Sequence, residues 1–389
     1  MLTLLALLIP AEPEVYEFDC DAGTVEFVAA ADEGTLGRYP TAYDATGDRL
    51  LTISFRDADE RVRPLVQLWT RPQPGQDAPP LREVGTGIAL NWAPDGSIVV
   101  QRRDLSDDTL PHAYELIWID PDTLEQTRSA QTKMNDPILS PGGDFAIGIR
   151  HRNWLIPGPP LRVARPDAFV GSEEPMRPNG WVVVLPKIRH AHLLGPATPS
   201  GRPHEQPIAV MSGFVPAEED GTYLLDDPGE QRIEPASLVA DPPKTPAGFT
   251  SLFGEPKKPP RMAVVAHTLH WRQPPGEQPS VVVERDAEPL LLLDPQTQTP
   301  WGIAQATQTG ELFATVFVQT ADEHRAELWV VDPAHPGQPR TLLRFPADAW
   351  PRGYAHPTAD GRRIAFAWDP FVAESGTHYE PNDLIVERE

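Results

Sequence analysis

The chain of 389 residues has very little cysteine and an excess of acidic over basic side chains. Cys20 is its one cysteine, and a single thiol excludes an intramolecular disulfide and any Cys-x-x-Cys metal or redox site. The 33 Lys and Arg residues against 56 Asp and Glu residues give a formal net charge of -23. Because nucleic-acid binding needs a clustered basic surface, no nucleic acid is expected as a partner.

The common catalytic and phosphate-binding motifs are also missing. The sequence contains no G-x-S-x-G nucleophile elbow and no G-x-x-x-x-G-K phosphate loop. Gly85-Thr86-Gly87 lacks the third glycine of a dinucleotide-binding turn. No catalytic residue and no organic cofactor is therefore predicted.

Long hydrophobic runs are absent except for a short apolar segment at the N-terminus. Met1–Ile9 falls short of the roughly 20 residues that span a bilayer, so membrane insertion is not expected. Two interpretations of residues 1–11 stay open. A secretory signal segment ending near Ala11, although it lacks a basic start, predicts a periplasmic or extracellular protein. A buried first strand predicts a cytoplasmic one.

Proline, in contrast, is abundant, with 47 residues or about 12% of the chain against a usual ~5%. An interior proline removes a backbone donor and clashes with the preceding helical turn, so a mainly helical chain is excluded. Short strands and many turns are expected instead. Two proline-rich stretches, 152–179 and 235–260, are expected to form long surface loops because they suit neither helices nor central strands.

An apolar run that ends at Asp-Pro recurs along the chain. Such a run predicts a strand buried on both faces, which the proline ends because it cannot donate to the ladder. The runs end near prolines 72, 121, 186, 228, 295 and 333, which are 49, 65, 42, 67 and 38 residues apart, and the smallest spacings are close to one repeat of about 40–45 residues. The clearest copies are Leu116–Pro121, Leu290–Pro295 and Leu328–Pro333.

A turn followed by alternating apolar residues precedes several of these runs. Proline presets φ at the first turn position, Asp bonds the local backbone, and Gly adopts the positive φ that closes a hairpin. Alternation then predicts a half-buried strand, so turn and strands together predict a four-stranded antiparallel blade. The turns are Asp44–Gly47, Ala93–Gly96, Ser140–Gly143, Thr307–Gly310 and Thr358–Gly361.

Ala93-Pro94-Asp95-Gly96 and Ser140-Pro141-Gly142-Gly143 resemble the S-P-D-G turn of the WD40-like (PD40), TolB-type β-propeller repeat. The resemblance extends from Gly37 to Glu389 and implies an all-β propeller over 37–389. A counterpart of the N-terminal domain of TolB is not expected, because only about 36 residues precede the first repeat.

The repeats predict seven blades, with six as the alternative because the fourth repeat, Ile208–Pro235, is the weakest. The last blade begins at Gly353 and contains only three recognisable strands. An open blade would expose a strand edge. We therefore expect a strand near Thr24–Val28, within the region 12–36, to close this blade and join the two ends of the chain.

His190 and His192 are the candidate metal ligands. Residues i and i+2 of a strand face the same way, so two imidazoles can share one ion. The resemblance adds that some propeller lyases acting on uronate oligosaccharides use a His-bound metal. The alternative interpretation is a pair of solvated histidines. His267 and His270 are weaker candidates because a spacing of three places their rings on opposite faces.

Other recurring residues are expected to be structural. His112 and His324 occupy matched positions of two repeats and are interpreted as framework residues. The aspartates of Asp-Pro, at 120, 294 and 332, are expected to cap the strands through Asx-type turns. Tryptophans 154, 301 and 350 lie near loop ends, where one or two are expected to line a binding face.

Two functions are consistent with these patterns. The first is a non-enzymatic propeller scaffold in the cell envelope that presents the loops of one face to a protein or peptide partner. The second is a propeller enzyme acting on polysaccharide, a metal-assisted lyase or a glycosidase, in the mouth of the central channel. A divalent metal is expected only for the enzyme, which needs His, Arg and carboxylates from several blades in one place.

Overall fold

The structure of the protein is a computed structural model. Statements below about what is absent concern only the residues that this structure describes. These are residues 19–20, 23–29, 35–58, 61–72, 81–103, 114–132, 135–149, 160–164, 180–184, 190–195, 197, 201–221, 231–233, 260–285, 288–320, 324–345, 349–372, 377–378 and 382–388.

The described strands form six sheets in which all pairings are antiparallel. Among the described residues no helix has the length and apolar character that crossing a bilayer requires. The first three sheets contain β3 (Thr35–Tyr43), β4 (Arg49–Ala58), β5 (Arg61–Thr70) and β6 (Arg82–Thr86); β7 (Ile88–Trp92), β8 (Ile98–Arg103), β9 (Tyr114–Ile119) and β10 (Gln126–Thr132); and β11 (Asn135–Leu139), β12 (Ala146–Ile149), β13 (Pro160–Ala164) and β14 (Gly180–Val184).

The next three sheets complete the ring. The fourth contains β15 (His190–Gly195), β16 (Glu205–Ala217), β17 (Gln231–Ile233), β18 (Arg261–Arg272), β19 (Ser280–Arg285) and β20 (Leu291–Leu293). The fifth contains β1 (Asp19–Cys20), β21 (Gln298–Gln305), β22 (Leu312–Gln319), β23 (His324–Val331) and β24 (Arg340–Arg344). The sixth contains β2 (Gly23–Ala29), β25 (Ala349–Pro357), β26 (Arg363–Val372), β27 (Thr377–His378) and β28 (Asn382–Arg388).

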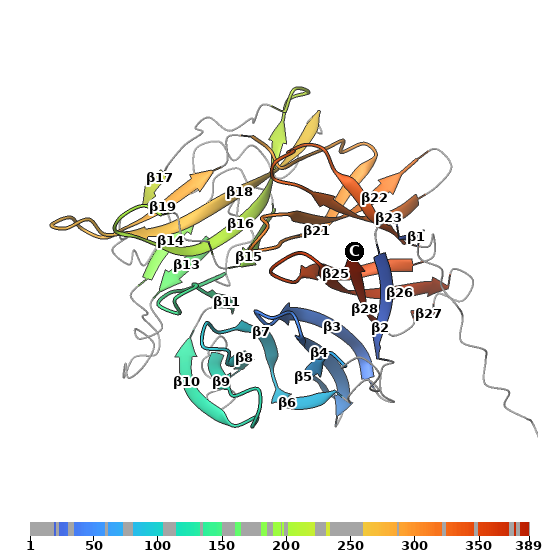
Figure 1. The fold of residues 1–389 in the computed structure, drawn as a ribbon, viewed down its shortest axis with the longest axis horizontal. Helices are drawn as coiled ribbons and strands as arrows, with labels where there is room; N and C mark the ends of the chain where they lie inside the picture. The colour runs from blue at the N-terminus through green and yellow to red at the C-terminus, as the bar shows by residue number, and fades with distance from the viewer. Residues whose placement is uncertain are drawn as a thin grey trace, which may run out of the picture.

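The sheets surround a common centre, so the fold is an all-β propeller (Figure 1). Five of the six described sheets follow one regular four-strand blade pattern. The fourth sheet departs from it, because its order is β15-β16-β18-β19-β17 and β20 pairs with β18. The expected seven blades are therefore wrong, and the alternative of six regular blades is not formed either.

The miscount arose in the fourth sheet. The weak fourth repeat and the apolar run at Leu290–Pro295 were counted as separate blades. However, β16 and β18, which lie before and after the stretch 235–260 in the chain, pair directly over a long ladder from Glu205↔Arg272 to Ala217↔Arg261. The apolar run at Leu290–Pro295 does not end a further blade, because Leu291–Leu293 pairs with the start of β18. A long insertion between paired strands hides their pairing from sequence periodicity.

The closing strand near Thr24–Val28 is confirmed. β2 pairs with β28 from Gly23↔Arg388 to Ala29↔Asp383 and becomes the outermost strand of the last sheet. Figure 1 shows β2 and β28, from opposite ends of the chain, side by side. A second pairing of an N-terminal strand was not expected: β1 pairs with β24 and so adds a strand to the fifth sheet.

One proline-rich stretch differs from expectation. Residues 152–179 were expected to form a loop, but Pro160–Ala164 is β13, a central strand between β12 and β14. Pro160 stands at its first position, where a missing donor is tolerated, and Leu161–Ala164 continue the ladder. Residues 1–11 and, apart from Pro260, the stretch 235–260 lie outside the described residues.

The apolar strands are buried on both faces because each face packs against a different neighbouring sheet. In β9, Leu116 and Trp118 join the core with the third sheet, whereas Ile117 and Ile119 join the core with the first. In β23, Leu328 and Val330 pack toward the sixth sheet, and Trp329 and Val331 pack toward the fourth. This sharing explains why the runs before Asp-Pro are continuously apolar rather than alternating.

The aspartates after these strands cap them as expected. The Oδ1 atom of Asp120 accepts hydrogen bonds from the backbone N–H groups of Asp122 and Thr123 at 2.9 and 2.8 Å. Asp294 and Asp332 accept in the same way from Gln296 and Ala334, both at 2.8 Å. The backbone N–H of Thr123 above all lowers the pKa of the Asp120 carboxyl below its usual value.

The predicted hairpin turns are formed, and those of neighbouring sheets touch. The N–H of Gly47 donates to the carbonyl of Asp44 at 3.0 Å, and that of Gly96 donates to Ala93 at 2.9 Å. Both glycines have positive φ, +72° and +85°. A Cβ added at Gly47 would lie 2.7 Å from Cγ2 of Thr358 in the sixth sheet, whereas one at Gly96 would meet open space.

The Gly47→Ala variant is therefore expected to lose about 2–4 kcal/mol of unfolding free energy, because alanine is strained in the left-handed conformation and its Cβ clashes with Thr358 of the sixth sheet. Gly96→Ala carries only the strain, about 1–2 kcal/mol, and is the matched control. Equilibrium unfolding in urea measures both. Equal losses would contradict the close packing of the two turns.

An ion pair joins the fifth and sixth sheets. Arg388 of β28 binds Glu311 through two hydrogen bonds, Nη1 to Oε2 at 2.8 Å and Nη2 to Oε1 at 2.9 Å, and also donates to the carbonyl of Gly361. Both side chains are largely buried, with 16% and 18% exposed. A bidentate, partly desolvated pair of this kind is among the stronger polar contacts.

Replacement of this arginine, Arg388→Gln, is expected to lower the free energy of unfolding by about 1–3 kcal/mol, because the Glu311 carboxylate keeps its burial and loses its partner. Arg362→Gln is the control, since the Arg362 side chain is 78% exposed and 4.0 Å from Asp360. Thermal unfolding of the two variants checks this. If the control were as unstable as Arg388→Gln, the Arg388–Glu311 ion pair would not be a special source of stability.

Candidate functional site

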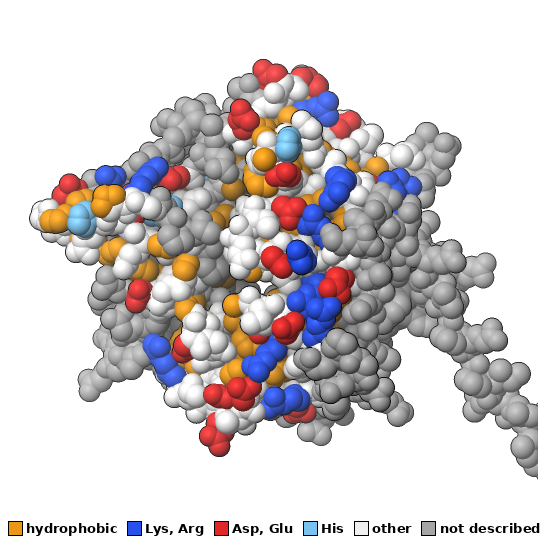
Figure 2. All heavy atoms as spheres, in the orientation of Figure 1, with side chains coloured by type: hydrophobic (Ala, Val, Ile, Leu, Met, Phe, Trp, Pro, Cys, Tyr) orange, Lys and Arg blue, Asp and Glu red, His pale blue; other side chains and the backbone are white. Residues whose placement is uncertain are grey.

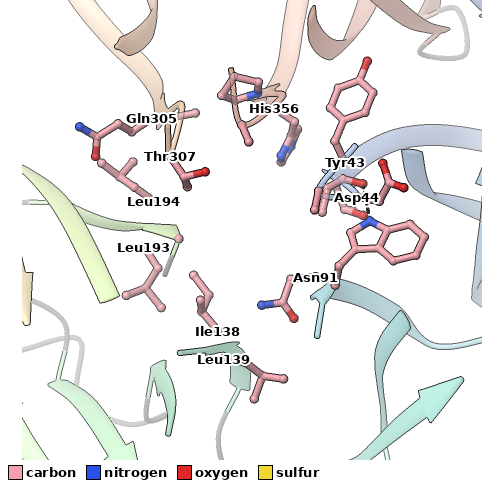
Figure 3. A pocket seen from close by; sticks show the side chains of 18 of the residues that line it. Tyr43, Asp44, Asn91, Ile138, Leu139, Leu193, Leu194, Gln305, Thr307 and His356 are labelled. Atoms are coloured by element: carbon pink, nitrogen blue, oxygen red, sulfur yellow. Dashed lines mark hydrogen bonds between the residues drawn. The ribbon is translucent and has the colours of Figure 1, made fainter. Parts of the chain in front are cut away.

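A cavity of about 950 Å³ lies at the centre of the propeller. It is formed by the C-terminal ends of the innermost strands of all six described sheets and by the turns that follow them, and Figure 3 shows it from close by. Its size is at the upper end of the range for ligand pockets. The lining includes Thr41–Thr46, Arg49, Asn91–Pro94, Gly96, Pro137–Pro141, Leu193–Gly195, Ala197, Ile303–Gln305, Thr307, Gln308, Tyr354–Pro357 and Ala359.

Apolar side chains make up one side of the central cavity. Ile138 of β11 and Leu193 and Leu194 of β15 line it, and Figure 3 shows Ile138 and Leu193 reaching toward its interior. All three are half-buried and pack at the edges of the hydrophobic cores behind them. This side of the cavity is therefore a hydrophobic surface of fixed shape.

The charged side chains that line the cavity are already engaged. Asp44 accepts hydrogen bonds from Thr46 Oγ1 at 3.0 Å and from the backbone of Asp48 at 3.0 Å. Arg49 pairs with Asp122 of the neighbouring sheet at 2.8 Å. Figure 2 shows acidic and basic side chains next to one another beside the central opening. Arg49 thus has an opposite charge as its partner, whereas the Asp44 carboxylate is held by neutral hydrogen-bond donors.

Asn91 projects into the cavity from the end of β7 (Figure 3). Its Oδ1 atom is buried and has no hydrogen-bond partner among the described residues. The neighbouring Trp92 is held by a hydrogen bond from its Nε1 to the carbonyl of Ala42, at 3.2 Å. The side chain of Asn91 is thus held by a fixed strand end, and its Oδ1 atom is covered rather than exposed to the cavity.

His356 projects into the same cavity from β25 (Figure 3). The side chain is half-buried, and burial lowers the pKa of His356 to about 4. The ring is therefore neutral at pH 7, with one nitrogen as donor and the other as acceptor.

The sequence did not single out Asn91 or His356, although a positional signal exists. Five of the innermost strands, β3, β7, β11, β21 and β25, end in a hairpin turn, and a residue two or three positions before that turn lines the cavity. Because these residues converge only when the ring closes, no local pattern marks them as a set. The residues at this position include Ala42, Asn91, Ile138, Ala304 and His356.

The histidines that the sequence singled out lie elsewhere. His190 and His192 belong to β15, opposite Phe214 and Ser212 of β16, so they share one face of a strand as expected. Their side chains are outside what the structure describes. His267 and His270 are buried in β18, and burial lowers the pKa of His270. No group of three potential metal ligands occurs among the described residues.

Of the three tryptophans expected near a binding face, only Trp301 has a side chain that the structure describes. Trp301 is 47% exposed on β21, where its ring packs edge-on against Phe317 at 5.4 Å between centroids. Trp154 lies outside the described residues, as does the side chain of Trp350. Whether Trp301 contacts a ligand stays a prediction.

No family model matches the chain, and no curated protein matches it in sequence. Among solved structures it is similar to the β-propeller domain of the Trilobed protease from Pyrococcus furiosus, with 9% identity, a TM-score of 0.42, and coverage of 92% of this chain and 96% of that one. It is also similar to an oligogalacturonate lyase from Vibrio parahaemolyticus (12% identity, TM-score 0.44, 96% of both chains). A third is TolB from Acinetobacter baumannii (9% identity, TM-score 0.38, 91% of this chain and 64% of that one).

The half-buried, neutral ring of His356 predicts a dependence of stability on pH. Its folded pKa of about 4 lies below the unfolded value of 6.5, so its contribution is complete above pH 6.5 and is lost as the pH falls toward 4. Between pH 7 and 5.5 the wild type is expected to lose about 1 kcal/mol relative to His356→Gln. Urea unfolding of both proteins at the two pH values measures it; parallel losses would contradict burial of the neutral ring.

Proposed function

We propose that the protein is a non-enzymatic propeller scaffold of the cell envelope that holds an uncharged segment of a protein or peptide partner in its central cavity. The main support is the character of the cavity lining. Its charged groups, Asp44 and Arg49, are engaged within the protein, whereas apolar side chains such as Ile138 and Leu193 reach toward the open space. Such a lining favours a neutral occupant with apolar parts.

The net charge of the chain bears on the rest of the partner. A formal charge of -23 attracts proteins with basic surfaces and accelerates their association at low salt. The proposed partner is therefore basic overall and inserts a neutral segment. The envelope location is proposed from the apolar residues 1–11 alone.

The lining is less suited to the alternative, an enzyme acting on an acidic polysaccharide. A uronate carboxylate needs a cationic or metal partner, and Arg49, the cation that lines the cavity, already binds Asp122 at 2.8 Å. The neutral ring of His356 supplies no positive charge at pH 7.

Thr307 provides a direct test. It is exposed, lines the cavity and points into it (Figure 3). In Thr307→Arg a long cation occupies the neutral cavity, so partner affinity is expected to fall at least tenfold, a loss of about 1.4 kcal/mol. Thr309→Arg, on the same turn but outside the lining, is the control and should bind as wild type. Affinity capture from the host, followed by titration of the captured protein, measures this.

A partner that binds wild type and Thr309→Arg but not Thr307→Arg supports the proposal. A partner held equally by all three proteins would move the binding surface away from the cavity. Cleavage of an oligouronide by wild type, lost in Thr307→Arg, would favour the enzyme instead.

A further inference from the structure

Exposed hydrophobic side chains gather at the centre of the propeller. Among the described residues three large hydrophobic side chains are exposed, and all three belong to innermost strands: Ile88 of β7, Trp301 of β21 and Tyr354 of β25. The two aromatic ones are on neighbouring strands, because β21 and β25 pack against each other at the centre of the ring (Figure 1). Single exposed hydrophobic residues are ordinary, whereas a group of them beside a cavity indicates a contact surface.

Tyr354 lines the central cavity with 41% of its surface exposed, and its ring lies against the backbone of β21. A Cβ atom added at Gly302 would lie 2.5 Å from Cδ1 of Tyr354, so the missing side chain at Gly302 makes room for the ring. Trp301, the residue before Gly302, is held by its edge-on contact with Phe317. The register of β21 with β22 and that of β25 with β26 both shift at these aromatic residues, and such irregularities redirect side chains. The two rings are therefore exposed in fixed positions.

The apolar wall of the cavity decides which part of a peptide suits these rings. A backbone N–H that leaves water beside Ile138 and Leu193 finds no acceptor on their side chains, and a buried donor without a partner costs free energy. Proline has no backbone N–H, so it avoids this cost. Its fixed φ also leaves less conformational entropy to lose, and aromatic-lined grooves bind extended proline-containing segments in several recognition domains.

Asp44 indicates the charge beside the proline. Its carboxylate lines the cavity where the turn after β3 begins, and β3 packs against β25, the strand that carries Tyr354. The donors that hold the carboxylate, the hydroxyl of Thr46 and the backbone N–H groups of Asp48 and Arg49, are neutral and leave its negative charge uncompensated. A Lys or Arg that flanks the neutral segment complements this charge.

We propose that Tyr354 and Trp301 receive a proline residue of the inserted segment and that Asp44 attracts a basic residue next to that segment. The cavity is then selective for a short sequence of the partner that combines a proline with a basic flank. This inference rests on the proposed function, since it assumes that a peptide segment enters the central cavity.

The test uses the full-length protein and a random heptapeptide library displayed on phage. Peptides selected on wild type are expected to share a proline, and replacing it by alanine in the synthetic peptide should weaken binding at least tenfold. Tyr354→Ala is expected to bind the selected peptides about tenfold to a hundredfold more weakly, and Tyr354→Phe, which restores the ring, should recover most of the affinity. Ile88→Ala is the control, since it removes a similarly exposed apolar side chain outside the cavity lining.

Gly302→Ala tests the placement of the Tyr354 ring without removing it. Gly302 has no positive φ, so the main effect of the new Cβ is its clash with the ring. Peptide affinity is expected to fall about tenfold in the wild-type background and to change little in Tyr354→Ala, where the clashing ring is absent. Equal losses in the two backgrounds would contradict a contact between the ring and the peptide.

Thermal unfolding of each variant separates lost recognition from lost folding. If Tyr354→Ala unfolds much earlier than wild type, Trp301→Ala decides the question, because its side chain is half exposed and its peptide affinity should fall about fivefold. The proline-to-alanine change in the peptide leaves the protein intact and gives the same answer independently. Asp44→Asn keeps an oxygen for the turn and is expected to reduce the salt dependence of binding. An unchanged salt dependence would overturn the role of Asp44.

The outcomes also distinguish this inference from the proposed function. Selected peptides that share no proline, or that bind Tyr354→Ala as well as wild type, overturn the inference; if they still fail on Thr307→Arg, the proposed function stands. Failure of wild type to select any peptide overturns both.

Discussion

The antiparallel ladder between β2 and β28 joins the two ends of the chain, and the ring depends on it. Without β2 the sixth sheet would present the unpaired edge of β28, next to the seam with the first sheet. Across that seam Leu50 and Trp69 pack against Ala365 and Ile385, and Arg71 binds Glu387 at 2.8 Å. One pairing thus fixes the position of the last sheet against the first.

The central cavity is a product of this closure. Its lining comes from the ends of six strands that are remote in sequence, and the hairpin turns behind them are held to one another by contacts such as the hydrogen bond from Gln308 N–H to the carbonyl of Ala359, at 2.8 Å. A rigid frame of this kind holds Asn91 and His356 at fixed positions at the cavity. Rigid positioning of a few polar groups on an otherwise apolar wall is what selective binding requires.

Much of the architecture could be predicted from local patterns, because turns and strand ends are local. The Asx caps at Asp120, Asp294 and Asp332 and the closing strand are examples. Long-range pairing was beyond reach: β16 and β18 pair across a proline-rich insertion, and β13 begins with a proline where prolines indicated a loop. The cavity residues could not be identified from the sequence for the same reason, because Asn91 and His356 belong to different repeats and line one cavity only in the closed ring.

The two-sided burial of strands such as β9 and β23 has a consequence for how the protein comes apart. Each hydrophobic cluster is shared by two sheets, and each sheet contributes to the clusters on both of its sides. If one sheet unfolded, the apolar faces of both neighbouring sheets would become exposed to water. Those sheets would then lose stability and unfold in turn. The ring therefore melts as a single cooperative unit, unlike an open array of repeats that frays from its ends.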